Sequence, residues 1–195
     1  MAAQTSHAPA QTSNPDIMVS PQFLAPYPVD LTIIRKVVSL SLGKFSVTDV
    51  NGNVVFKVKP KKISLHDRRS LLDAADNPIL SFRKKVRSAH NKWVVFNGAG
   101  MTGYITGFFL GFNEKDVCDY KVKGSWHDRS CTIYAGLPMD KKYTVQNVAL
   151  GKDTCVVTVY PNIDHAFIVA LVVILHEINE QIQAASQIPS MMLMI

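Results

Sequence analysis

The chain has 195 residues, a mass of 21.6 kDa and a hydrophobic fraction of 47%, and its net charge is +6 with a pI near 9.2. This length and apolar content suit one domain with a sizeable core, and they exclude global disorder. The positive charge favours anionic partners such as acidic lipid or nucleic acid, although an ordinary solvated basic surface is the simpler explanation. Three widely spaced cysteines exclude a disulfide framework and a zinc site: Cys118, Cys131 and Cys155.

The chain begins with a segment that predicts no packed structure. Residues 1–24 are rich in Ala, Gln, Ser, Thr and Pro, a composition typical of a disordered tail. No basic start followed by an apolar run is present, so we expect no secretory signal. An odd number of cysteines fits a reducing compartment, and a cytoplasmic protein is expected, with the plasma-membrane surface and the nucleus as alternatives. The predicted domain occupies residues 25–180, and residues 181–195 are predicted to be a tail.

Short β-branched and aromatic runs separated by turn signals follow this tail. Residues 44–50 and 53–59 alternate apolar with polar side chains on either side of Asn51-Gly52, which predicts a hairpin with a type I′ turn. Further strands are predicted at residues 70–73, 79–83, 92–96, 117–122, 131–134, 143–148 and 154–160. Successive hairpins without intervening helices predict an antiparallel sheet, closed into a barrel or folded into a sandwich.

The pattern changes at Asp164, which is a suitable N-cap for a helix over residues 164–179. The residues after it are apolar on every side, which excludes a surface helix. Their uncharged run, residues 166–175, is about half of the roughly 20 residues that span a bilayer. The helix is therefore predicted to lie inside a curled sheet. Its predicted core residues are Asp164, Phe167, Ile168, Val169, Leu171, Val172, Ile174 and Leu175.

Five segments resemble the LURP-one-related family of plants, which is similar to tubby and to phospholipid scramblases. They are PQFLAPYPVDLTIIRK, GKFSVTDVNGNVVFKVKP, LHDRRSLLDAADNPILSFRKK, DYKVKGSWHDRSCTIYAG and TVYPNIDHAFIVALVVILHEINE. The resemblance covers residues 21–98 and 113–180. It implies a mainly β fold, a tubby-like antiparallel β-barrel that encloses a hydrophobic C-terminal α-helix. It also suggests a role in plant defence or, by analogy with tubby, membrane-tethered transcriptional regulation.

The sequence departs from this family between Gly98 and Asn113, where the chain is shorter than the resemblance leads us to expect. Loss of a strand at this place would leave an open edge in the barrel. An alternative splice form or a faulty gene model would explain the difference.

Catalytic and metal-binding motifs are absent from the sequence. We find no Gly-rich phosphate loop, no metal-ligand spacing and no nucleophile motif, so no enzymatic activity, cofactor or metal is expected. His165 and His176 flank the apolar helix about three turns apart, a separation that excludes a shared ligand. Both are interpreted as boundary or core residues.

Basic residues are the strongest functional feature. If adjacent strands bring them together, they form a face that attracts anionic headgroups, each contributing about 1 kcal/mol. Phosphoinositide binding is implied by the resemblance to tubby-like domains. The alternative is that outward lysines prevent edge-to-edge sheet pairing. The candidate lipid-binding residues are Lys57, Lys59, Lys61, Lys62, Arg68, Arg69, Arg83, Lys84, Lys85 and Arg87.

These features predict a monomeric, non-enzymatic scaffold or adaptor whose partners are anionic phospholipid or proteins. Nucleic acid ranks lower, because aromatic side chains are not interleaved with the basic ones. An alternative is a single-span membrane protein through residues 93–112, where no charge occurs and Gly103, Gly107 and Gly111 recur every four residues.

Overall fold

A computed structural model describes residues 19–36, 43–60, 68–84, 93–97, 104–108, 120–125, 130–135, 141–146 and 153–186. It contains the 3₁₀ helix η1 (Pro21–Phe23) and the helix α1 (His165–Ser186). The strands are β1 (Val29–Lys36), β2 (Lys44–Thr48), β3 (Val54–Pro60), β4 (Arg69–Asp73), β5 (Pro78–Lys84), β6 (Trp93–Asn97), β7 (Tyr104–Phe108), β8 (Tyr120–Ser125), β9 (Ser130–Ala135), β10 (Lys141–Gln146) and β11 (Thr154–Val159).

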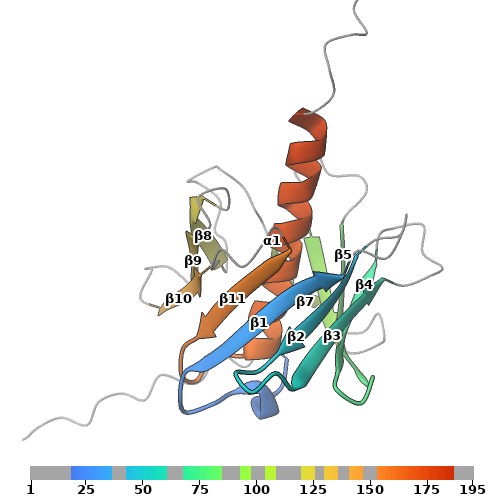
Figure 1. The fold of residues 1–195 in the computed structure, drawn as a ribbon. Coiled ribbons are helices and arrows are strands. Elements are labelled where there is room, and N and C mark those ends of the chain that lie inside the picture. Colours follow the sequence, from blue (N-terminus) through green and yellow to red (C-terminus); the bar gives the residue numbers. More distant parts are fainter. Residues whose placement is uncertain are drawn as a thin grey trace, which may run out of the picture.

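All of these strands belong to one antiparallel sheet with the order β7-β6-β5-β4-β3-β2-β1-β11-β10-β9-β8. Neighbours in space are neighbours in sequence except at β1 and β11, which pair and join the two halves of the chain. The sheet curls around α1 (Figure 1). The predicted fold, a mainly β protein whose curled antiparallel sheet surrounds a C-terminal helix, is therefore confirmed.

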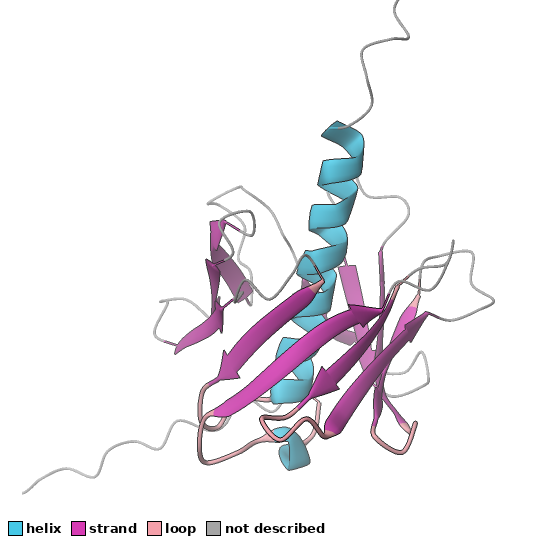
Figure 2. Cartoon of the chain, in the orientation of Figure 1, coloured by secondary structure: helices cyan, strands magenta, loops and turns pink. Residues whose placement is uncertain are grey.

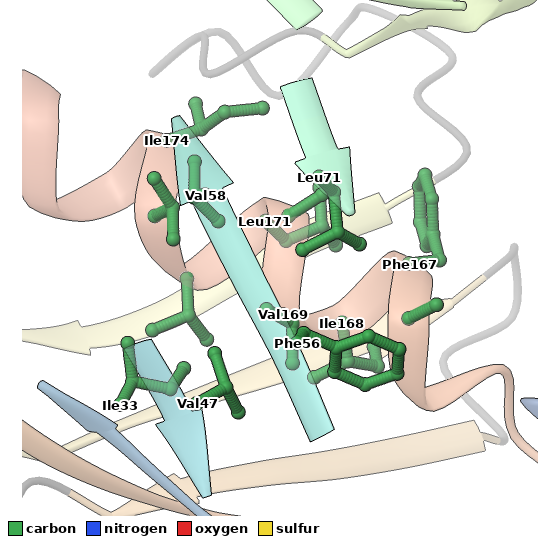
Figure 3. Packing of buried hydrophobic residues seen from close by; sticks show 14 of the residues in the cluster. Ile33, Val47, Phe56, Val58, Leu71, Phe167, Ile168, Val169, Leu171 and Ile174 are labelled. Atoms are coloured by element: carbon green, nitrogen blue, oxygen red, sulfur yellow. The ribbon is translucent and has the colours of Figure 1, made fainter. Parts of the chain in front are cut away.

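The core is built on α1. Nine consecutive helix residues, 166–174, are each at most 3% exposed. Because nine residues make about two and a half turns, the helix is covered on all of its sides. Alternate strand residues such as Ile33, Val47 and Phe56 point toward it (Figure 3). The remaining predicted core residues of the helix, Asp164 and Leu175, are also buried.

The sheet order ends at β7 and β8, which follow one another along the chain. Within the part of the chain that the structure describes, no ladder joins these two strands. Residues 109–119 separate β7 from β8 along the chain. The two unpaired edges of the sheet therefore lie next to the segment between Gly98 and Asn113, which the sequence indicates to be shortened.

The single-span alternative is wrong, because its described residues form strands. Val94 and Val95 belong to β6, which pairs with β5 and β7, and Tyr104–Phe108 forms β7 itself. Sequence analysis missed β7, since its Gly107, together with Gly103 and Gly111, gives the small-residue spacing of membrane helices. Among the described residues, no helix combines the length and the apolarity that a membrane crossing requires.

The hairpin between β2 and β3 has a different turn from the predicted type I′. Gly52 has a positive φ of 83°, whereas Asn51 does not adopt the positive φ that this turn would demand. The Asp49 carboxylate accepts hydrogen bonds from the backbone N–H groups of Asn51 (2.9 Å) and Asn53 (2.8 Å). This local bonding by an aspartate side chain stabilises the observed turn instead.

Packed structure begins earlier than the predicted residue 25. Asp164 caps α1 through Oδ1, which accepts from the Phe167 N–H at 3.1 Å, as expected. Its Oδ2 accepts from the N–H groups of Val19 (2.7 Å) and Ser20 (3.3 Å). Phe23 in η1 is buried nearby, so residues 19–24 close this end of the barrel.

Candidate anion-binding end of the barrel

Charged side chains divide along the axis of the barrel. One end of the barrel is the place where α1 leaves the sheet. The C-termini of β1, β3 and β5 lie at this end, together with the N-termini of β2, β4 and β6. We call this the basic end. Its described cations are Arg35, Lys36, Lys44, Arg68, Arg69, Arg83 and Lys84, and its described carboxylates are Asp153, Glu177 and Glu180.

The opposite end of the barrel, where α1 begins, carries charges of both signs, and we call it the mixed end. Its described carboxylates are Asp30, Asp49, Asp73, Asp76 and Asp164, and its described cations are Lys57 and Lys59, which bond to Asp76, and Lys121, Lys141 and Lys142, which the strand register places there. The excess of cations within the described residues therefore lies at the basic end. An anionic surface would be attracted to that end more strongly than to the other.

Arg68 and Arg83 are the best-placed anion-binding side chains at the basic end. Their guanidinium carbons lie 5.5 Å and 5.6 Å from the centre of the Phe96 ring, which points to the outer face of the sheet and is 4% exposed. Arg68 Nη2 donates to Ser81 Oγ at 2.8 Å. Among the described residues, no carboxylate pairs with either arginine. Both guanidinium groups thus contact the same aromatic ring.

The predicted lysines contribute less at this place. Lys57 and Lys59 both bond to the Asp76 carboxylate, at 3.2 Å and 2.7 Å. Lys84 Nζ donates to Gln181 Oε1 at 2.8 Å. The other predicted residues of this set, Lys61, Lys62, Lys85 and Arg87, lie outside the described residues.

Arg69 does not share this surface, contrary to expectation. It is 1% exposed and points inward, because successive residues of β4 face opposite sides of the sheet. Its Nη2 forms an ion pair with Glu177 Oε1 at 2.7 Å, and its Nη1 donates to the Gly43 carbonyl at 2.6 Å. Arg69 is therefore part of the core at the basic end.

A further contact holds α1 at the basic end, and sequence analysis did not predict it. Arg35 pairs with Glu180 of α1 at 2.9 Å and with Asp153, which precedes β11, at 3.5 Å. With the Arg69–Glu177 and Lys84–Gln181 contacts, this ties just over one helical turn, residues 177–181, to β1, β4 and β5. The helix is therefore fixed against rotation and sliding where it leaves the sheet.

His165 is the first residue of α1, and His176 lies near the middle of α1, just after the buried run of residues 166–174; both side chains are mostly buried. His165 packs against the Phe23 ring and His176 against the Phe45 ring. Burial lowers the pKa of both imidazoles below the ordinary value of 6.5. Arg35 and Arg69 lower the pKa of His176 further, and Glu180 and Asp153 oppose them.

These lowered pKa values predict that acidification destabilises the fold. Below pH 6.5 the unfolded chain takes up protons at both histidines, whereas the folded chain does so only at lower pH. The free energy of unfolding should fall from pH 7.5 to 6.0, with a limiting slope of about 1.4 kcal/mol per pH unit for each histidine. Urea unfolding at both pH values measures this loss.

His165→Phe and His176→Phe are the matched variants, since each keeps an aromatic ring. Each should reduce the pH dependence. An equal loss of stability in the wild type and both variants would show that other groups cause it. Burial raises the pKa of Asp164 and of Glu177, which acts in the opposite sense, because the folded chain then keeps a proton that the unfolded chain has lost. The two histidine variants separate the contribution of the histidines from that of these carboxyl groups.

Comparison with known proteins agrees with this architecture. Residues 29–176 match the family model described as LURP-one-related. Protein LURP-one-related 15 of Arabidopsis thaliana is 45% identical, with 87% of this chain and 88% of that protein covered. Protein LURP-one-related 10 of the same plant is also 45% identical, with coverages of 84% and 97%. An X-ray structure of an Arabidopsis thaliana protein, 40% identical, superposes with a TM-score of 0.67 and coverages of 84% and 98%.

The alignments also bear on the shortened segment. The alignment with Protein LURP-one-related 15 is 192 positions long, but it covers only 87% of this 195-residue chain, which is fewer than 192 residues. That relative therefore has residues inside the matched region that have no counterpart here. On the family model and these relatives, the chain belongs to the LURP-one-related family of plants.

Proposed function

We propose that this protein is a non-enzymatic adaptor that binds anionic phospholipid surfaces with the basic end of its barrel. The observation that carries the proposal is the Arg68–Arg83 pair, two guanidinium groups on the same Phe96 ring without a described carboxylate partner. Guanidinium groups present planar pairs of N–H donors that match the oxygens of a phosphate. Phosphate headgroups, including those of phosphoinositides, are the chemistry that such a pair recognises.

The excess of cations at the basic end supports a defined orientation on the membrane. The attraction of a cation to an anionic membrane decays within a Debye length of about 8 Å at physiological salt. In this orientation the side chains at the basic end contribute to the attraction, and those at the mixed end lie too far from the membrane to do so. Lys57 and Lys59 contribute less, because Asp76 already offsets their charge.

The double variant Arg68→Gln/Arg83→Gln tests the proposal. At about 1 kcal/mol for each cation, it should weaken binding to phosphoinositide-containing vesicles roughly 30-fold. Vesicle titration followed by sedimentation measures the affinity.

Lys57→Gln/Lys59→Gln is the matched control, because it removes the same formal charge from side chains that are bonded to Asp76. It should cause a clearly smaller loss. Equal losses in the two variants would mean that only net charge matters, and would reject the basic end as the binding site. If neither variant differs from the wild type, the membrane contact lies elsewhere.

A further inference from the structure

The exposed large apolar side chains of the described residues all lie at the mixed end. Tyr27 precedes β1 and Tyr160 follows β11, while Val50 and Val54 belong to the hairpin of β2 and β3. We call these four residues the apolar rim. Strands β11, β1, β2 and β3 are successive neighbours in the sheet, so at about 4.8 Å per strand the rim spans roughly 15 Å. Isolated exposed apolar residues are common, whereas a group of them indicates an interaction surface.

Val50 is presented by a turn with many internal hydrogen bonds. Besides the two bonds from backbone N–H groups to the Asp49 carboxylate, Asn53 Nδ2 donates to Asp49 Oδ2 at 3.1 Å. The N–H of Asp49 donates to the Asn53 carbonyl and the N–H of Gly52 to the Asp49 carbonyl, both at 3.0 Å. Figure 2 shows this turn among the pink segments at the end of the barrel where α1 begins. A preordered turn loses little freedom when a partner binds.

The neighbouring hairpin of β4 and β5 shows that such a turn does not require a valine. Its Asn77 N–H donates to Asp73 Oδ1 at 2.8 Å, and Asn77 Nδ2 donates to Asp73 Oδ2 at 2.9 Å. The position that corresponds to Val50 is Ala74. Val50 is 76% exposed, so its side chain is not part of the core either. Its apolar surface is therefore available to a partner.

Carboxylates beside the apolar rim indicate the charge of that partner. The register of β1 and β2, continued by two residues, places the exposed Asp30 across from Val50. No described cation forms an ion pair with Asp30 or Asp49. Hydrogen bonds from Asn53 and Asn51 lower the pKa of Asp49, so its carboxylate stays ionised at neutral pH.

The cations of the mixed end lie to either side of this place. Lys57 and Lys59 are bonded to Asp76, and the register of β10 and β11 places Lys142 next to Tyr160. The acidic part of the surface therefore lies over β1 and the turn after β2.

We propose that the apolar rim, with Asp30 and Asp49, binds a segment of another protein in which aromatic or aliphatic side chains are next to lysine or arginine. Tyrosine side chains, which combine a large apolar surface with a hydroxyl group, are enriched in protein interfaces. The carboxylates select a basic segment and add specificity. Because this surface and the Arg68–Arg83 pair lie at opposite ends of the barrel, the protein can hold such a partner with or without a membrane.

Selection from a library of random displayed peptides, on immobilised full-length protein without lipid, tests the proposal. The enriched peptides should combine basic with aromatic or aliphatic residues. In the double variant Tyr27→Ser/Val50→Ser, the affinity for the synthesised peptides should fall about tenfold or more, as expected for side chains central to an interface. Both residues are exposed, so the variant should keep the thermal transition of the wild type.

Two further variants test the role of charge. Asp30→Asn keeps an acceptor for the Thr158 hydroxyl, which donates to Asp30 Oδ1 at 2.7 Å. It should weaken peptide binding and make the affinity less dependent on salt. Arg68→Gln/Arg83→Gln is the control at the basic end, and it should bind the peptides as the wild type does.

The outcomes are independent of vesicle binding, so failure of the proposed function would leave this inference standing. Peptides that bind Tyr27→Ser/Val50→Ser as tightly as the wild type would overturn the inference. Enrichment of acidic peptides whose binding is lost in Arg68→Gln/Arg83→Gln would also overturn it, because they would occupy the basic end. A selection that enriches no peptide would count against it in the same way.

Discussion

Val169→Asp is expected to unfold the protein. Val169 is fully buried in the N-terminal part of α1, and the side chains around it on helix and sheet are apolar. A carboxylate there would have no partner, and such a group costs several kcal/mol even if it becomes protonated. A domain of this size has a total stability of about 5–15 kcal/mol, so most of it would be lost.

Circular dichroism with heating measures this effect. The wild type should show a cooperative transition, and Val169→Asp should lack it. Val50→Asp introduces the same charge at an exposed turn residue and should change the stability by about 0.5 kcal/mol or less. A preserved transition in Val169→Asp would contradict the buried helix.

Arg69→Met has the second largest expected effect. It would leave the Glu177 carboxylate, 9% exposed, without its partner at 2.7 Å, and the Gly43 carbonyl without its donor. Removal of one partner from a buried ion pair costs about 3–5 kcal/mol. Urea unfolding at pH 7.5 should show this loss in the free energy of unfolding.

The double variant Arg69→Met/Glu177→Met completes the test. With both charges removed, no buried charge remains unpaired, and most of the lost stability should return. If the single variant cost less than about 1 kcal/mol, Glu177 would have to reach solvent, and the Arg69–Glu177 pair would not fix α1.

Elements with a strong local pattern were predictable from the sequence. The alternation on both sides of Asn51-Gly52 gave β2 and β3, and the uncharged run after Asp164 gave a helix that only a curled sheet can cover. The turn itself was not predictable from Asn-Gly alone, because the Asp49 side chain decides its geometry. β7 was missed, since its Gly107 belongs to a set of glycines spaced every four residues and its strand conformation depends on pairing with β6.

The candidate site was predictable only in part. The sequence identified the basic residues, and the period of two in a strand places Arg68 and Arg69 on opposite faces. Sequence analysis could not show that Phe96 holds both Arg68 and Arg83, or that Asp76 pairs with Lys57 and Lys59. Side chains far apart in sequence make these contacts, and only the register of the sheet brings them together.

The most direct test of the proposed function is flotation of the purified wild-type protein with vesicles. Neutral vesicles of phosphatidylcholine are compared with vesicles that also contain phosphoinositide, each at low and high salt. The basic end predicts binding that requires the anionic lipid and weakens as salt rises. A folded protein that floats with neither kind of vesicle would contradict it, and a protein-binding adaptor would then be the better account.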